Sequence, residues 1–267
     1  MDAPLHILRL GSPDLPLMVW LHGFLGDGRD WVFLSRAFPD HQHWLPDLTG
    51  HGQTGIWHHD GGFDALVVAL MDEWSAAGNP PMTVIGYSMG GRLALHWAMR
   101  HPKNIRRLAL LSASAGIATE EARLARRQHD DELASRLLHI HDEAGMARFL
   151  EDWYAAPLWQ SLHDVYKQNL IEQRRQQNPQ ALAMGLRAMS IGRQPYHLPD
   201  LASFTHPALL MAGAKDPKFV TITQEMQAHW SLAKSVIVSN AGHNLIIECP
   251  DLVTDTLKSF FADSLSS

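Results

Sequence analysis

The sequence around Ser88 has the pattern of a reactive serine. Ser88 lies in the segment Gly86-Tyr87-Ser88-Met89-Gly90, between a predicted buried strand at residues 82–86 and a predicted helix at residues 90–100. This G-x-S-x-G pattern, with a strand before it and a helix after it, is typical of a sharp turn that exposes a reactive serine. Backbone N–H groups at the start of the helix favour negative charge that develops beside them. We therefore interpret Ser88 as a catalytic residue.

Two further residues follow Ser88 in the chain order Ser, Asp, His. Asp216 comes soon after a predicted strand at residues 208–212, and His243 lies in the loop after another at residues 235–238. A histidine there can accept the serine proton, and an aspartate can fix the tautomer of the histidine. A plain turn aspartate and a satisfied loop histidine are the alternatives. We predict a triad of Ser88, His243 and Asp216.

Negative charge developing on a substrate oxygen would need backbone N–H donors. One is expected from Met89, the residue after the serine, and the other from Phe24, in the turn after a predicted strand at residues 17–21. Gly23 lets this turn fold close to Ser88. The predicted oxyanion hole therefore joins two segments far apart in the sequence.

The elements that must position these residues alternate along the chain. Strands are predicted at residues 17–21, 43–45, 82–86, 108–112, 208–212 and 235–238, and helices at residues 30–38, 63–76, 90–100 and 251–261. This alternation predicts an α/β fold with a mostly parallel sheet flanked by helices. Between residues 119 and 201 helical spacing dominates instead. We expect a helical cap at residues 117–204, inserted into a core of residues 1–116 and 205–267.

Composition limits the function classes. The chain has 267 residues, 46% hydrophobic and 19% charged, and a net charge of -6, so a nucleic-acid partner is not expected. No signal peptide or membrane span is evident, and a cytoplasmic enzyme is expected. Histidine pairs such as His41/His43 and His58/His59 lack the cysteines or carboxylates that would complete a metal site. The oligomeric state does not follow from the sequence.

The chain resembles the MenH family of 2-succinyl-6-hydroxy-2,4-cyclohexadiene-1-carboxylate synthases, which have the α/β-hydrolase fold. The resemblance is carried by Leu21-His22-Gly23-Phe24-Leu25-Gly26 with Trp31, Gly50-His51-Gly52, Gly86 to Arg92, Arg126-Arg127-Gln128-His129-Asp130, Asp152-Trp153-Tyr154 with Pro157, Arg174, Gln194-Pro195, Lys218-Phe219 and Asn240-Ala241-Gly242-His243-Asn244. Thr49 departs from the family pattern, in which a proline usually precedes the Gly-His-Gly segment.

The resemblance implies a carbon–oxygen lyase of menaquinone biosynthesis. Its members eliminate pyruvate from 2-succinyl-5-enolpyruvyl-6-hydroxy-3-cyclohexene-1-carboxylate, and the serine acts as a base with no metal or organic cofactor. Because this small substrate carries three carboxylates, the resemblance implies cations around the pocket. The residues that it implies for substrate binding are Arg92, Arg126 and Arg174, with Tyr87, Trp153, Tyr154 and Trp159 as pocket walls.

Other interpretations remain open from the residues alone. The neighbouring arginines could form a solvated basic helix face, and the aromatic residues could belong to the core of the cap. The same triad would also serve a carboxylesterase or a C–C bond hydrolase. A ligand receptor on the same fold is a third possibility, which the complete triad disfavours.

Overall fold

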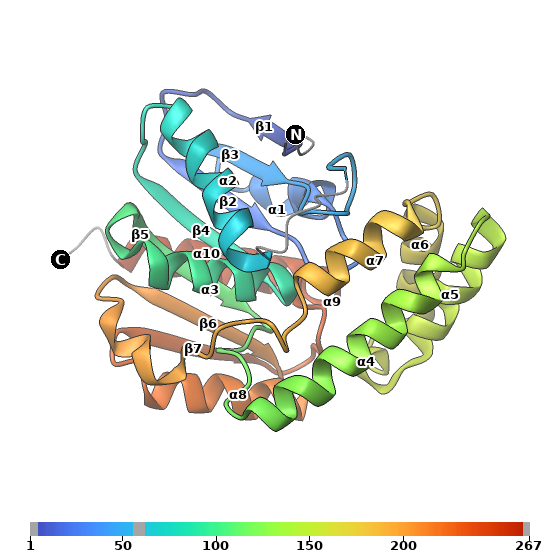
Figure 1. Ribbon diagram of the computed structural model, residues 1–267. Coiled ribbons are helices and arrows are strands. Elements are labelled where there is room, and N and C mark those ends of the chain that lie inside the picture. The colour runs from blue at the N-terminus through green and yellow to red at the C-terminus, as the bar shows by residue number, and fades with distance from the viewer. Residues whose placement is uncertain (1–4, 56–61, 264–267) are drawn as a thin grey trace.

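The computed structural model describes residues 5–55 and 62–263, and its centre is a seven-stranded sheet (Figure 1). The strands are β1 (Ile7–Leu10), β2 (Leu17–Leu21), β3 (Gln42–Pro46), β4 (Met82–Tyr87), β5 (Ile105–Leu111), β6 (Ala208–Gly213) and β7 (Ala233–Val238). Their order is β1-β3-β2-β4-β5-β6-β7, and the strands pair in parallel except for β1, which is antiparallel to β3. The predicted α/β fold with a mostly parallel sheet is confirmed.

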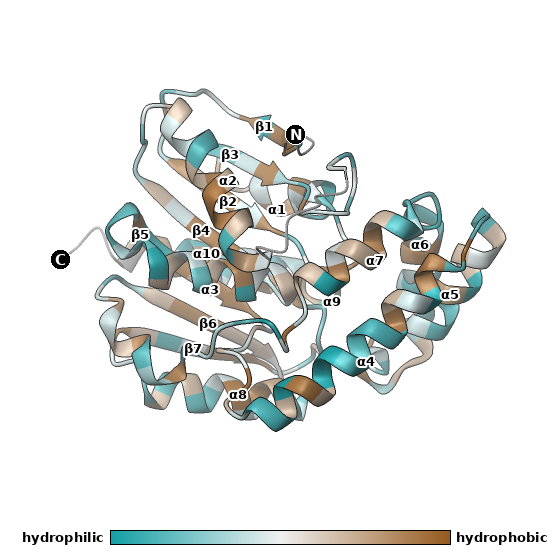
Figure 2. Cartoon of the chain, viewed as in Figure 1, coloured by the Kyte–Doolittle hydropathy of each residue, from teal (hydrophilic) through white to brown (hydrophobic). Residues whose placement is uncertain are grey.

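Helices cover both faces of the sheet. One hydrophobic cluster joins the sheet to α2 (Gly62–Ala76), α3 (Met89–Arg100) and α8 (Pro217–Ala228). A second cluster joins the other face to the short helices η1 (Gly28–Trp31) and α1 (Val32–Ser35), to α9 (Leu245–Glu248) and to α10 (Pro250–Asp263). The central strands β2, β4 and β6 are buried along their whole length, because side chains on both faces meet helices. Figure 2 shows β4 and β6 as mainly hydrophobic.

Four helices of ten or more residues lie between β5 and β6 in the sequence. They are α4 (Glu120–Leu138), α5 (Glu143–Ala155), α6 (Asp164–Arg174) and α7 (Pro179–Ala188), and we call them the inserted helices. They lie together at one side of the sheet (Figure 1) and share a third hydrophobic cluster, which includes Leu137, Leu150 and Leu182. Side-chain caps define where they begin: Thr119 accepts from the Ala122 N–H, and Asp142 accepts from the Gly145 N–H. Short helices η3 (Pro157–Trp159) and η4 (Leu198–Ser203) complete the connections, and η2 (Pro102–Asn104) leads into β5.

The predicted elements correspond closely to those observed. The predicted strand at residues 17–21 is β2, and the helical spacing at residues 120–138 is α4. The predicted helix at residues 30–38 is instead the pair η1 and α1, which together end at Ser35. Sequence reasoning missed β1, because this edge strand has only four residues and is half exposed. It also missed α8, which begins directly after Asp216.

Candidate active site

The turn between β4 and α3 holds Ser88 in a strained backbone conformation. Its φ is 50° and its ψ is -110°, a region that residues with a side chain rarely adopt. Ser88 precedes the first residue of α3, and its hydroxyl does not cap that helix. Two glycines make the turn possible: a Cβ on Gly86 would meet the Gly90 carbonyl oxygen at 2.5 Å, and one on Gly90 would meet the Leu21 carbonyl oxygen at 2.2 Å. The hydroxyl is therefore free for chemistry.

Ser88, His243 and Asp216 form a connected chain of hydrogen bonds. Oγ of Ser88 lies 3.1 Å from Nε2 of His243, and Nδ1 of His243 lies 2.8 Å from Oδ2 of Asp216. A carboxylate only accepts, so Nδ1 carries the proton and Nε2 is left to accept the proton of the serine. Both His243 and Asp216 are buried. The structure thus brings the three predicted residues together with the tautomer that a base requires.

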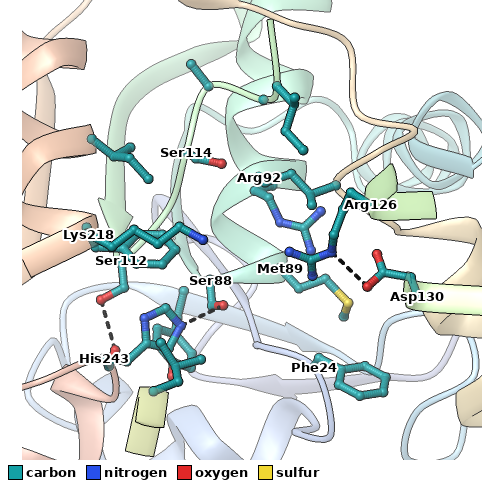
Figure 3. A pocket seen from close by; sticks show the side chains of 18 of the residues that line it. Phe24, Ser88, Met89, Arg92, Ser112, Ser114, Arg126, Asp130, Lys218 and His243 are labelled. Atoms are coloured by element: carbon teal, nitrogen blue, oxygen red, sulfur yellow. Dashed lines mark hydrogen bonds and ion pairs between the residues drawn. The ribbon is translucent and has the colours of Figure 1, made fainter. Parts of the chain in front are cut away.

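The imidazole of His243 is also held by groups around it. The ring centroid of Phe219 lies 4.6 Å away, that of Trp159 lies 5.5 Å away and that of Tyr87 lies 5.6 Å away. Behind it, the Ser112 hydroxyl donates to the His243 carbonyl oxygen at 2.9 Å (Figure 3). Sequence reasoning missed the roles of Ser112 and Phe219. Its only signal for Phe219 was the Lys218-Phe219 pair in the resemblance.

The loop after β2 approaches the serine closely. A Cβ on Gly23 would meet Cε1 of Tyr87 at 2.7 Å and Cβ of Ser88 at 3.6 Å, so only glycine fits there without a shift. Phe24 and Met89, the two predicted oxyanion donors, line the same pocket as Ser88 (Figure 3). The loop is therefore placed where its backbone N–H could reach a substrate oxygen bound beside Ser88.

A cavity of about 390 Å³ opens over Ser88 and His243. Among the predicted residues, its walls include Phe24, Tyr87, Ser88, Met89, Arg92, Arg126, Trp153, Trp159 and His243. Lys218, which sequence reasoning quoted without assigning it a role, also lines the cavity, as does Glu225. Figure 3 shows Lys218 extending from the α8 side, while Arg92 and Arg126 lie on the other side. The size is that of a pocket for one small molecule.

Two arginines bring positive charge into this cavity. Arg92 donates to the Met189 carbonyl oxygen at 2.8 Å, and burial, together with the nearby charge of Arg126, lowers its pKa from 12.5 to about 9. Arg126 is paired with the buried Asp130 at 2.8 Å, and the Ser190 hydroxyl donates to the same carboxylate. Within the part of the chain that the structure describes, Arg92 has no carboxylate at ion-pair distance. Arg92 is therefore a cation whose charge an anionic ligand could neutralise.

The structure places Arg174 and Tyr154 elsewhere. Neither is among the described residues that line the cavity, so their contact with a substrate stays a prediction. The guanidinium of Arg174 is buried, pairs with Asp30 at 3.0 Å and donates to the Tyr154 hydroxyl. Burial alone would lower the pKa of Arg174, but Tyr154 and Asp30 raise it above the ordinary 12.5.

Comparisons with known proteins agree with this geometry. The sequence matches the family model of the alpha/beta hydrolase fold over residues 16–250. It is 31% identical to the 2-succinyl-6-hydroxy-2,4-cyclohexadiene-1-carboxylate synthase of Enterobacter sp. (strain 638), over 93% of both chains. It is 32% identical to the synthase of Salmonella newport (strain SL254), over 92% of this chain and 94% of that one. The solved structure of MenH from S. aureus superposes with a TM-score of 0.89 at 31% identity, covering 97% of this chain and 98% of that one.

The chain belongs to the MenH family of the α/β-hydrolase fold. The resemblance drawn from the sequence is thereby confirmed. An enol-lactonase from Burkholderia xenovorans LB400 has a TM-score of 0.80 at 20% identity, and this likeness shows the shared fold alone.

The described residues contain neither a metal-binding cluster nor a membrane-spanning helix. In residues 5–55 and 62–263, no group of three or more His, Cys, Asp or Glu is arranged to hold a metal ion, and His58 and His59 lie outside these ranges. No helix of this described part is long and apolar enough to cross a membrane.

Proposed function

We propose that this enzyme eliminates pyruvate from 2-succinyl-5-enolpyruvyl-6-hydroxy-3-cyclohexene-1-carboxylate, as the names of its relatives suggest. The observation that carries the proposal is a connected Ser-His-Asp triad whose Ser88 and His243 line a cavity together with Arg92, a cation with no carboxylate at ion-pair distance among the described residues. A hydrolase of simple esters needs the triad but not the cation. A substrate with several carboxylates needs both, because guanidinium groups bind carboxylates through paired hydrogen bonds.

The proposed reaction begins with proton transfer to Ser88. Oγ of Ser88 takes the ring proton next to the succinyl ketone and passes its own proton to Nε2 of His243. The ketone oxygen gains negative charge, which the N–H groups of Phe24 and Met89 would stabilise. The electron pair then forms the conjugated diene, and the C–O bond to the enolpyruvyl group breaks. The leaving group takes up a proton and departs as pyruvate, so no water is consumed.

The other residues of the cavity fit supporting roles. Arg92 and Arg126 would bind substrate carboxylates, with Asp130 holding Arg126 in place through its 2.8 Å ion pair. Trp153 and Trp159 would form apolar walls against the ring of the substrate. Tyr87 stays a neutral phenol at physiological pH, because burial raises its pKa well above 10.

The inserted helices would act as a cap. We propose a core of residues 1–116 and 205–267 and a cap of residues 117–204, because Arg126, Trp153 and Trp159 bring this segment over the cavity. The small anionic substrate and a cytoplasmic location belong to the same proposal.

Pyruvate release tests the proposal directly. Purified enzyme is supplied with the enolpyruvyl substrate, and pyruvate is followed with a coupled dehydrogenase; a p-nitrophenyl ester is run in parallel. We expect pyruvate release that is lost in Ser88→Ala. Fast ester cleavage without pyruvate would contradict the lyase and indicate a serine hydrolase.

A further inference from the structure

The loop that carries the Phe24 N–H contains an unusual backbone. Leu25 has a φ of 67°, which a residue with a branched side chain adopts only when its surroundings impose it. Leu25 is completely buried and directly follows Phe24. The groups that impose this conformation therefore also determine where the Phe24 N–H points.

Two hydrogen bonds fix the Leu25 residue from opposite sides. On the core side, its N–H donates to Nε2 of His51 at 3.2 Å. Burial lowers the pKa of His51 to about 3, so this imidazole is neutral and can accept. On the other side, Nε2 of Gln177 donates to the Leu25 carbonyl oxygen at 2.6 Å. Gln177 lies between α6 and α7, so the inserted helices contribute one of the two contacts.

A second contact reaches the same loop from α6. Arg174 pairs with Oδ2 of Asp30, and a Cβ on Gly26 would meet that same oxygen at 2.3 Å. Asp30 is thus packed directly against the end of the loop, where the Gly26 N–H donates to the Gly23 carbonyl oxygen at 3.0 Å. The ion pair between Arg174 and Asp30 therefore contacts the loop, although neither residue lines the cavity.

Helix α7 seats the inserted helices on the core beside this loop. A Cβ on Gly50 would meet the Ala181 carbonyl oxygen at 2.2 Å, and one on Gly185 would meet the Thr49 carbonyl oxygen at 2.4 Å. These backbone contacts leave no room for sliding between α7 and the turn that holds His51. Gln177, just before α7, is therefore placed accurately with respect to the Leu25 carbonyl.

We propose that Gln177 and Arg174 are positioning residues, which hold the oxyanion loop from the inserted helices and so set the Phe24 N–H. This inference rests on the proposed function of the triad and assigns Arg174 a role different from substrate binding. It also accounts for a polar atom without a partner: Oε1 of Gln177 is buried and unbonded among the described residues, while its amide nitrogen makes the contact to Leu25. The hydrogen bond from Nε2 to the Leu25 carbonyl oxygen therefore orients the Gln177 side chain.

The first test is Gln177→Met, with Gln176→Met as the matched control at an exposed neighbouring position. Methionine keeps the length but leaves the buried Leu25 carbonyl without its donor, so we expect the melting temperature to fall by several degrees while the enzyme stays folded in the assay. We expect kcat for pyruvate release to fall about tenfold or more, with KM within twofold, because a misplaced donor weakens only the transition state. The control should keep wild-type kinetics. Unchanged kcat in Gln177→Met, or an equal loss in the control, would overturn the proposal.

Arg174→Lys separates positioning from substrate binding. Lysine keeps a charge beside Asp30 but cannot reach both Asp30 and Tyr154 with one planar group. We expect a lower kcat at nearly constant KM. A KM increase at unchanged kcat would show that Arg174 binds the substrate and would refute its positioning role.

A second readout does not depend on the lyase substrate. An alkyl fluorophosphonate forms a bond from Ser88 Oγ to phosphorus as fluoride leaves, and its phosphoryl oxygen needs the same oxyanion donors. Slower labelling in Gln177→Met supports the proposal even if the wild type releases no pyruvate, in which case only the proposed function has failed. Equal labelling rates in wild type and Gln177→Met would overturn the positioning role.

Discussion

A methyl group added at Gly23 should disable the enzyme while leaving it folded. In Gly23→Ala the new Cβ would stand 2.7 Å from Cε1 of Tyr87, whereas carbon atoms in contact ordinarily lie 3.5–4.0 Å apart. One of the two sides must therefore move by about 1 Å. Tyr87 is only 5% exposed and contacts His243, and the loop is held through Leu25, so movement of either side disturbs the site.

The expected magnitude follows from this displacement. A shift of about 1 Å in a catalytic group costs roughly 100-fold in rate, and loss of one oxyanion donor costs about 10² to 10³. We therefore expect kcat for pyruvate release to fall roughly 100-fold. Overpacking should cost the free energy of unfolding about 1–3 kcal/mol, which leaves the protein folded at assay temperature.

The assay measures kcat and KM for pyruvate release together with thermal unfolding. Gly145→Ala is the control, because Gly145 lies in helix α5, away from the cavity, and its added methyl group meets mainly side-chain atoms at 3.1 Å or more. Alanine there should be neutral or slightly stabilising. A folded Gly23→Ala enzyme with kcat within threefold of the wild type would refute the assigned place of the loop beside the substrate oxygen.

Two further perturbations address charge. Arg92→Met should raise KM by about 10- to 100-fold with a smaller effect on kcat, because a charge-assisted hydrogen bond contributes about 1.5–3 kcal/mol. The control Arg36→Met changes an exposed side chain and should leave KM unchanged. A KM of Arg92→Met equal to that of the wild type would show that Arg92 does not bind the substrate. For His51 the pKa lies near 3 in the folded protein against 6.5 in the unfolded chain, so the unfolded state binds the extra proton. The resulting stability is complete above pH 6.5 and is lost as the pH falls toward 3, by about 2 kcal/mol at pH 5. Urea unfolding at pH 7 and pH 5 should show a smaller pH-dependent loss in His51→Gln than in the exposed-site control His139→Gln, and equal losses would contradict this account.

The triad and its scaffold could be predicted because their signals are local. A buried strand, a glycine-rich turn and a helix follow one another around Ser88, and small residues are required there by backbone contacts of 2.2–2.5 Å. Asp216 and His243 each follow a strand of the same sheet, and parallel strands deliver their carboxyl ends to one edge. The order of elements is therefore enough to predict which residues form the triad.

The contacts of the inserted helices were harder to predict, because helical spacing does not say which face of a helix packs against which neighbour. Arg126 and Arg174 both stand among other arginines in the sequence, yet one lines the cavity and the other is buried against Asp30. Asp30, the carboxylate partner of Arg174, lies 144 positions away along the chain. The contact from Gln177 to Leu25 spans 152 positions, and a backbone carbonyl leaves no trace of its partner in the sequence.

The difference between a lyase and a hydrolase on this fold depends on the cavity more than on the triad. The hydrogen bonds among Ser88, His243 and Asp216 suit a base and a nucleophile equally, since both roles begin by moving the serine proton to Nε2 of His243. What selects the reaction is which substrate atom is held 3 Å or so from Oγ. Carboxylates bound by Arg92 would fix the ring so that its C–H faces the serine, while the carbonyl oxygen faces the loop. The specificity of the reaction would then be set by the contacts between Arg92 and the substrate carboxylates, which take no part in the proton transfer itself.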